Sequence, residues 1–322
     1  MNRMVKKLKP KICIIGSGFV GQATGKGFSS LGFNVTFLDI NPLKVQKLRE
    51  EGFKAYHPDE LKNGTFDFDV SFLSVPTPTE NERINLNMME EASKYLGKRL
   101  YALNKYHLVV VKSTVLPGTT ENLVVKLIEK YSGKSVGKNF GICMNPEYLR
   151  ERFADEDFLK SWVIVIGEYD HRSGNLLEEI YEDFDCPKYR VSLQEAEIQK
   201  YIHNLFNAVK ITFFNEMRQI TQNAGLDPEL IFPLVAESAE GNWNPFYGLK
   251  DQGPFSGNCL PKDTRAFLSW VEDNGLSADL LKQTIKVNEQ IAQKHPEKQK
   301  NTPQPKRDKT YGRYLADRSI QH

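Results

Sequence analysis

The chain has 322 residues, which at about 150 residues per domain predicts two domains. Its 43 basic and 41 acidic side chains nearly cancel, but residues 294–322 carry eight basic and three acidic groups, so this tail is +5 and the rest is −3. We therefore expect no nucleic-acid-binding body, and no apolar run reaches the roughly 20 residues that span a membrane. The four cysteines form no CxxC pair and the six histidines form no cluster, so we expect no disulfide framework, no metal site and a reduced, cytoplasmic protein.

The first 190 residues alternate short β-branched runs with amphipathic stretches. Strands are predicted at residues 11–16, 34–39, 69–74, 107–113, 140–144 and 162–167. These runs are apolar at nearly every position, which predicts a mostly parallel sheet covered by helices on both faces. We assign residues 1–190 to a Rossmann-type, doubly wound α/β domain.

The apolar period changes to 3.6 residues from about residue 194, and helical patterns continue to residue 292. Residues 191–293 are therefore predicted to form an all-helical domain that begins with one long helix. This helix is apolar on more than one face, for example at Leu205, Phe206 and Val209, and we expect a second subunit to cover it in a homodimer. The tail, residues 294–322, holds only five apolar side chains among 29 and is expected to be disordered.

A GxGxxG element, with glycines at Gly16, Gly18 and Gly21, joins the first predicted strand to a helical run. In this context Gly16 makes a tight turn, Gly18 lets the backbone approach a diphosphate, and Gly21 allows close helix packing. The diphosphate would lie at the start of the helix, near Phe19 and Val20, where unpaired N–H groups favour negative charge. The alternative is a structural glycine turn in an unrelated doubly wound protein.

Asp39 ends the second predicted strand, 21 residues after Gly18. A carboxylate at this place accepts hydrogen bonds from an adenosine ribose and repels a 2′-phosphate. Because no arginine stands beside it, the sequence predicts NAD as the cofactor in preference to NADP.

Cys259 is predicted to lie in a tight loop at the start of a helix and is followed by Pro261, Lys262 and Asp263. A helix N-terminus and a nearby lysine both favour the thiolate that a cysteine nucleophile requires. The alternative is a small buried cysteine, the commoner case. Lys200 and Asn204 lie four residues apart and hence on one helical face, although lysine is most often a solvated surface residue.

These segments resemble the UDP-glucose/GDP-mannose dehydrogenase family. The loop around Cys259 resembles the family's F-G-G-x-C-x-P-K-D loop, and the resemblance extends over roughly residues 10–290. The other shared segments are the glycine turn, Ser-Val-Pro-Thr-Pro at 74–78, Lys-Ser-Thr at 112–114 and Asn-Pro-Glu-Tyr-Leu-Arg-Glu at 145–151. It implies an NAD-dependent oxidation of a sugar-nucleotide C6 alcohol to a carboxylate, by two hydride transfers through a thiohemiacetal and a thioester on Cys259.

The resemblance also implies roles for individual residues. Lys200 would stabilise the developing alkoxide, and Asn204 would hold the ammonium or a water. Glu147, Thr114 and Asp263 match the positions that serve thioester hydrolysis, although Glu147 could instead cap a helix and Thr114 could simply end a strand. The implied cofactor contacts include Thr77, Thr114 and Lys262, and the implied substrate contacts are Glu147, Tyr148, Leu149, Glu151, Lys200, Asn204, Phe255 and Gly257.

The chain departs from the family pattern at several places. In the cysteine loop, Ser256 replaces the second glycine and Asn258 replaces a residue that is usually small. Residues 242–245 lack the arginine that the family offers across a dimer. Residues 158–162 replace a Pro-x-Arg element, and Arg152 replaces a glycine. The family's third domain, which grips the nucleotide, is expected to be absent. Affinity for the nucleotide sugar should then fall unless a separate chain supplies the contacts or the substrate is smaller.

Three functions follow as alternatives. The first is a nucleotide-sugar 6-dehydrogenase, with UDP-glucose as the leading substrate and GDP-mannose or UDP-N-acetylmannosamine as the others. The second is a non-catalytic regulator that binds NAD or a sugar nucleotide. The third is an oxidoreductase for a simpler hydroxy acid, which rests on the two-domain plan alone.

Overall fold

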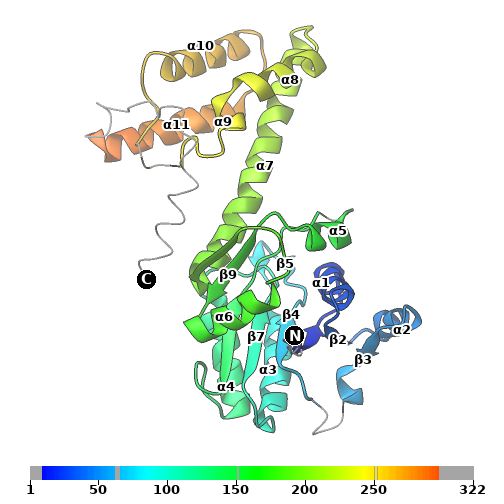
Figure 1. Ribbon diagram of the computed structural model, residues 1–322. Helices are drawn as coiled ribbons and strands as arrows, with labels where there is room; N and C mark the ends of the chain where they lie inside the picture. Colours follow the sequence, from blue (N-terminus) through cyan, green and yellow to red (C-terminus); the bar gives the residue numbers. More distant parts are fainter. Residues whose placement is uncertain (1–8, 62–65, 151, 250, 252, 297–322) are drawn as a thin grey trace, which may run out of the picture. The chain divides into compact units, whose positions relative to one another are not determined.

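The computed structural model describes residues 9–61, 66–150, 152–249, 251 and 253–296. The chain forms two compact units, and the division between them falls after His203, within the long helix α7. Each unit is described by itself below, with the elements labelled as in Figure 1.

The first unit is built on an eight-stranded sheet with the strand order β10-β9-β8-β7-β4-β1-β2-β3. Its strands are β1 (Lys11–Ile15), β2 (Asn34–Leu38), β3 (Lys54–Tyr56), β4 (Val70–Leu73), β7 (His107–Val111), β8 (Phe140–Met144), β9 (Ile164–Glu168) and β10 (Lys188–Ser192). All neighbouring strands are parallel except β8 and β9, which are antiparallel. The mostly parallel sheet and its six predicted strands are thus confirmed. The strands β3 and β10 and the hairpin β5 (Thr79–Glu80) to β6 (Arg83–Ile84) were not predicted.

Helices cover both faces of this sheet, as the doubly wound prediction requires (Figure 1). They are α1 (Phe19–Ser30), α2 (Pro42–Glu50), α3 (Asn87–Tyr101), α4 (Lys126–Ser132), α5 (Ala154–Leu159) and α6 (His171–Ile180), with the short helices η1 (Pro58–Glu60) and η2 (Thr120–Val125). Consecutive residues of β1 point to opposite faces of the sheet, and Ile14 and Ile15 belong to two different apolar clusters. One cluster includes Leu96 of α3 and the other Phe28 of α1. The sheet is therefore buried on both faces, which explains its continuous apolar strands.

The second unit is helical, as predicted. It contains the later part of α7 (Leu193–Asn223), then α8 (Pro228–Ser238), α9 (Glu240–Trp243), α10 (Leu260–Asp273) and α11 (Asp279–Lys294). Its small core includes Ile220 and Val271, and the Glu216 carboxylate accepts a hydrogen bond from the Leu280 N–H, at 2.8 Å, which ties α7 to α11. The predicted disordered tail lies almost wholly outside the described residues.

The apolar side chains of α7 are largely exposed in the single chain. Leu205, Phe206, Val209 and Ile211 retain 60%, 62%, 54% and 62% of their surface accessible to solvent. None of the described helices is both long and apolar enough to cross a membrane.

Candidate functional site

The glycine turn after β1 has a geometry that other residues would not permit. Gly16 has a φ of +92°, and a Cβ there would lie 2.7 Å from the Ser74 carbonyl oxygen. A Cβ on Gly21 would lie 2.0 Å from the Gly16 carbonyl oxygen, so this glycine is needed for the close return of α1. A Cβ on Gly18, the N-cap of α1, would meet no atom within 4 Å. The start of α1, at Phe19 and Val20, therefore faces open space in which a diphosphate can approach the unpaired N–H groups.

Asp39 follows β2 and is only 7% exposed. One carboxylate oxygen accepts hydrogen bonds from the Ser17 N–H and the Ser17 hydroxyl, at 2.6 and 2.7 Å. The other oxygen accepts from the Asn41 N–H, at 2.8 Å. The carboxylate thus joins the end of β2 to the glycine turn, and the partner residue Ser17 was not singled out from the sequence. Together with the open approach at Gly18, this arrangement fits a dinucleotide.

Thr77 and Thr114 lie together in the first unit, after the neighbouring parallel strands β4 and β7. The Thr77 hydroxyl donates to the Thr114 carbonyl oxygen, at 2.8 Å. The Ser113 hydroxyl donates to the Val75 carbonyl oxygen, at 2.6 Å, and so binds the same two segments. Ligands of open α/β sheets bind outside the carboxyl ends of such strands. The two threonines lie at this edge of the sheet, and their role as cofactor contacts stays a prediction.

Glu147 and Lys200, 53 residues apart in the sequence, form a buried ion pair. The Lys200 ammonium lies 3.1 Å from Oε1 of Glu147 and also donates to the Glu147 carbonyl oxygen. Lys200 is 5% exposed, so it is not a solvated surface residue. The second carboxylate oxygen of Glu147 accepts from the Leu149 N–H, at 2.7 Å. Residues 145–150 form no helix, so Glu147 is not a helix cap.

Aromatic rings surround this ion pair. The ring centre of Tyr148 lies 4.9 Å from that of His203, 6.5 Å from that of Trp162 and 5.2 Å from the Lys200 ammonium. The Tyr148 hydroxyl donates to the side chain of Gln199, and burial raises the pKa of Tyr148 and keeps it neutral. Burial and then the nearby Lys200 charge lower the pKa of His203. The ammonium is therefore largely shielded from water, which strengthens its action on a nearby negative charge.

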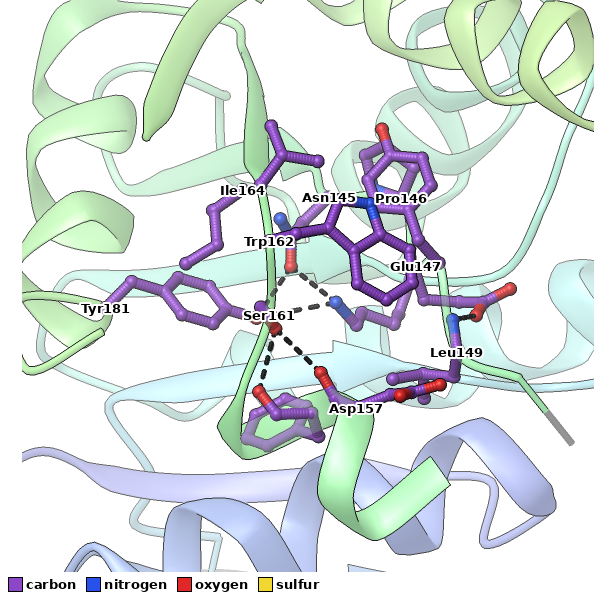
Figure 2. A pocket seen from close by; sticks show the side chains of 13 residues that line it. Asn145, Pro146, Glu147, Leu149, Asp157, Ser161, Trp162, Ile164 and Tyr181 are labelled. Atoms are coloured by element: carbon purple, nitrogen blue, oxygen red, sulfur yellow. Dashed lines mark hydrogen bonds between the residues drawn. The ribbon is translucent and has the colours of Figure 1, made fainter. Parts of the chain in front are cut away.

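A small cavity adjoins the ion pair (Figure 2). Its lining includes Lys112, Asn145, Glu147, Trp162 and Tyr181. Lys112 and Asn145 belong to sequence motifs but had no predicted role, and no sequence pattern pointed to Tyr181. No sequence signal links these three residues, because they come from the ends of three separate elements.

The second unit carries the predicted cysteine. Cys259 is exposed and immediately precedes α10, where its carbonyl oxygen accepts from the Asp263 N–H, at 2.8 Å. It is therefore not a buried packing cysteine, unlike Cys13 and Cys143, which are 0% exposed and whose pKa values burial raises. Lys262 and Asp263 are exposed and paired with each other, and this hydrogen bond raises the pKa of Lys262.

Two further substrate candidates lie in the loop before Cys259. Gly257 has a φ of +87°, which favours glycine there. Asn288 of α11 fixes the backbone of Phe255, accepting from its N–H at 2.7 Å and donating to its carbonyl oxygen at 3.0 Å. Asn204 is exposed on α7, and Glu151 lies outside the described residues. Within the described part of the chain, no group of three His, Cys, Asp or Glu side chains is arranged to hold a metal ion.

Comparison with known proteins identifies relatives along most of the chain. Residues 10–64 and 59–185 match the NAD binding domain of the UDP-glucose/GDP-mannose dehydrogenase family, and residues 194–290 match its central domain. A GDP-mannose 6-dehydrogenase of Pseudomonas aeruginosa is 33% identical over 303 residues, covering 88% of this chain and 69% of that protein. A UDP-glucose 6-dehydrogenase of Haloferax volcanii is 34% identical over 302 residues, covering 87% and 69%.

Solved structures of proteins with the same two activities have a similar fold. A ternary complex of GDP-mannose dehydrogenase from Pseudomonas aeruginosa superposes with a TM-score of 0.81 at 32% identity, covering 88% of this chain and 69% of that one. A UDP-glucose dehydrogenase from Pyrobaculum islandicum has a TM-score of 0.68 at 34% identity, with the same coverage. The cofactor of the matched N-terminal domain is NAD, in agreement with the glycine turn and Asp39. The chain belongs to the UDP-glucose/GDP-mannose dehydrogenase family.

Proposed function

We propose that the protein oxidises the C6 hydroxyl of a nucleotide sugar to a carboxylate, with NAD as the oxidant. The observation that carries this proposal is the buried pair of Lys200 and Glu147, in which a shielded ammonium lies 3.1 Å from a carboxylate oxygen. Such a pair supplies both groups that the reaction needs, a cation for a developing alkoxide and a carboxylate for a hydrolytic water. Cys259 supplies the nucleophile between these steps.

The protein's own groups act in sequence. The C6 hydroxyl gives its proton to a water held by Asn204, one helical turn along from Lys200. The Lys200 ammonium stabilises the negative charge that develops on the C6 oxygen. Bound NAD supplies the hydride acceptor for both oxidations. The Cys259 sulfur bonds to the aldehyde carbon, and the second oxidation converts this adduct to a thioester. A water positioned by Glu147, Thr114 and Asp263 attacks the thioester carbon; the C–S bond breaks with its electrons on sulfur, and Glu147 takes the water's proton.

Two sugar nucleotides are the main candidates for the substrate. Relatives that are GDP-mannose and UDP-glucose 6-dehydrogenases are 33% and 34% identical to this chain, so identity does not favour either. UDP-glucose remains the leading prediction from the sequence. GDP-mannose is supported by the TM-score of 0.81 with the GDP-mannose dehydrogenase structure. UDP-N-acetylmannosamine is the third candidate.

A substrate panel tests this function. Purified protein is mixed with NAD and each UDP- or GDP-sugar, and NADH absorbance is followed to completion. We expect two NADH per molecule of the true substrate. One NADH per molecule would indicate simple alcohol oxidation, and none across the panel, with NAD still bound, would favour the non-catalytic regulator.

Asp39→Asn is expected to weaken NAD binding. An amide has one oxygen where the carboxylate has two, so in either orientation its nitrogen faces the N–H of Ser17 or of Asn41 and cannot accept from it. Hydrogen bonds to a charged group contribute about 1.5–3 kcal/mol, so the Kd for NAD should rise about 10- to 100-fold. Isothermal titration calorimetry measures this, with Asp59→Asn, a change at an exposed carboxylate, as the control. An unchanged Kd would show that Asp39 does not support the cofactor site.

The exposed apolar residues of α7 are expected to form the interface of a homodimer. Replacing Phe206, which is 62% exposed, with glutamate would place a charge in this interface and lower the mass found by light scattering to that of one chain. Leu43→Glu, which places the same charge at an apolar side chain of α2 that is 74% exposed, is the control and should remain dimeric. A wild-type protein of monomer mass would contradict the prediction.

A further inference from the structure

Lys112, the first residue after β7, is a buried lysine whose hydrogen bonds in the described part of the chain go to uncharged groups. It is 5% exposed, and its ammonium nitrogen donates to Oδ1 of Asn145 at 2.7 Å and to the hydroxyl of Tyr181 at 3.4 Å. Both acceptors are uncharged, and in the described part of the chain Lys112 forms no ion pair. A buried charge without a partner is costly, so a lysine in such a place calls for a functional explanation.

The hydrogen bonds of Lys112 hold the start of the segment that carries Glu147. Asn145 Oδ1 also accepts from the Tyr181 hydroxyl at 2.7 Å, and Asn145 Nδ2 donates to the Val165 carbonyl oxygen at 2.8 Å. The Asn145 side chain is therefore fixed from β7, from β9 and from the end of α6. Glu147 lies only two residues after Asn145, so the hydrogen bonds of Asn145 also restrict where the Glu147 backbone can lie.

A cavity of about 20 Å³ is lined by both Lys112 and Glu147 (Figure 2). About 10–15 Å³ is enough for one water molecule, provided that polar groups surround it. Lys112, Glu147 and Ser161, each with a polar side chain, all belong to this lining. The cavity therefore has room for one water beside these side chains.

We propose that Lys112 is a positioning residue for Glu147 that, through one water in this cavity, receives the proton that Glu147 takes during thioester hydrolysis. This inference rests on the proposed function, because it assigns Glu147 the hydrolytic proton. Lys112 acts through Glu147 and does not itself touch the substrate.

The charges around Lys112 fit this role. Burial lowers its pKa to about 7, while the Glu147 charge raises it and the Lys200 charge lowers it further. Tyr181, at the end of α6, stays neutral because burial raises its pKa. Asp157 of α5, which shares the cavity lining, is paired with Arg150, and that hydrogen bond lowers its pKa. Near neutral pH a fraction of Lys112 is therefore a free amine with a lone pair.

The proton transfer balances without another reactant. After hydrolysis Glu147 carries the proton of the attacking water. It gives this proton to the water in the cavity, which gives one of its own to the Lys112 amine. A carboxylate and an ammonium result, and the ammonium returns its proton to solvent before the next turnover.

The pH dependence of steady-state turnover tests the proposal, using the full chain with the sugar that the panel identifies. In the wild type, kcat should rise with an apparent pKa near 7 as Lys112 becomes an amine. Lys112→Met keeps the length of the side chain and removes the amine. Its kcat should fall about 10- to 100-fold and lose this rise, with little change in KM.

Tyr181→Phe is the matched control. It removes a hydrogen bond to the same Asn145 oxygen but leaves the amine, so its kcat should keep the rise near pH 7. The proposal is overturned if Lys112→Met keeps the wild-type pH profile, or if Tyr181→Phe loses the rise equally, since the effect would then be structural.

A stability measurement separates this inference from the proposed function. Above pH 7 the unfolded lysine keeps its proton while the folded one releases it, so wild-type stability should rise with pH from about 7 toward 9. Lys112→Met should lose this rise in urea unfolding. If the panel gives no NADH, the proposed function fails and the relay with it, even where the stability rise is found. If NADH forms but the rise is absent in the wild type, the relay alone is overturned.

Discussion

A Cys259→Ser variant is expected to release one NADH per sugar molecule and no acid, where the wild type releases two NADH. The exposed thiol at the start of α10 supplies the bond to the aldehyde carbon, and a serine hydroxyl at the same place is a far weaker nucleophile near neutral pH. Loss of a nucleophile usually lowers turnover by several orders of magnitude, and we expect acid formation to fall at least about 10³-fold.

Both products, NADH and the acid, are measured, because the thioester route predicts that only the first NADH forms in the variant. NADH is counted by absorbance, and the acid is counted by anion-exchange chromatography of the same reaction. Cys186→Ser, at a partly exposed cysteine of the first unit, is the control and should behave as the wild type. Two NADH per sugar from Cys259→Ser would exclude the thioester route.

Lys200→Met is expected to slow the first oxidation about 10²- to 10³-fold, the usual loss when one group that stabilises an oxyanion is removed. The substitution keeps the length of the side chain but removes the charge, and it also leaves the buried Glu147 carboxylate without its partner at 3.1 Å. The corresponding sugar-nucleotide aldehyde bypasses the first step. With this substrate the variant should lie closer to the wild type than it does with the alcohol.

Stopped-flow measurement of NADH formation, with each of the two substrates, separates the steps. Lys210→Met removes a positive charge from the exposed part of the same helix and should leave both rates unchanged. An equal loss with alcohol and aldehyde would show that Lys200 does not act on the alkoxide and serves the general integrity of the site.

Local patterns predicted the framework because they reflect burial directly. A strand covered on both faces must be apolar at successive positions, and β7, with all five residues buried, is the plainest example. The glycine turn was predictable for a similar reason, since the backbone at Gly16 and Gly21 leaves no room for a side chain. The strand β10, with its half-buried Lys188–Ser192, carries no such pattern and was missed.

Contacts between distant residues were not predictable in the same way. The motif around Glu147 and the helical position of Lys200 were both visible, but only the fold brings their charges within 3.1 Å. Lys112 is a stronger case, because a lysine in a sequence is normally exposed and nothing near it predicts burial. Its depth follows from the packing of Asn145 and Tyr181, which are 33 and 69 residues away.

The reversal of β9 has a consequence for how the cavity wall can vary. Because β9 runs antiparallel to β8, the chain enters β9 from the side of the sheet at which β7 and β8 end. Ser161 and Trp162 are thus carried on the approach to a strand, whereas Lys112 and Asn145 are fixed at strand ends. Substitutions at Ser161 or Trp162 would therefore alter this wall and leave the strand ends at Lys112 and Asn145 in place. The cavity can therefore be reshaped from one wall without a change in the strands that carry the charged residues.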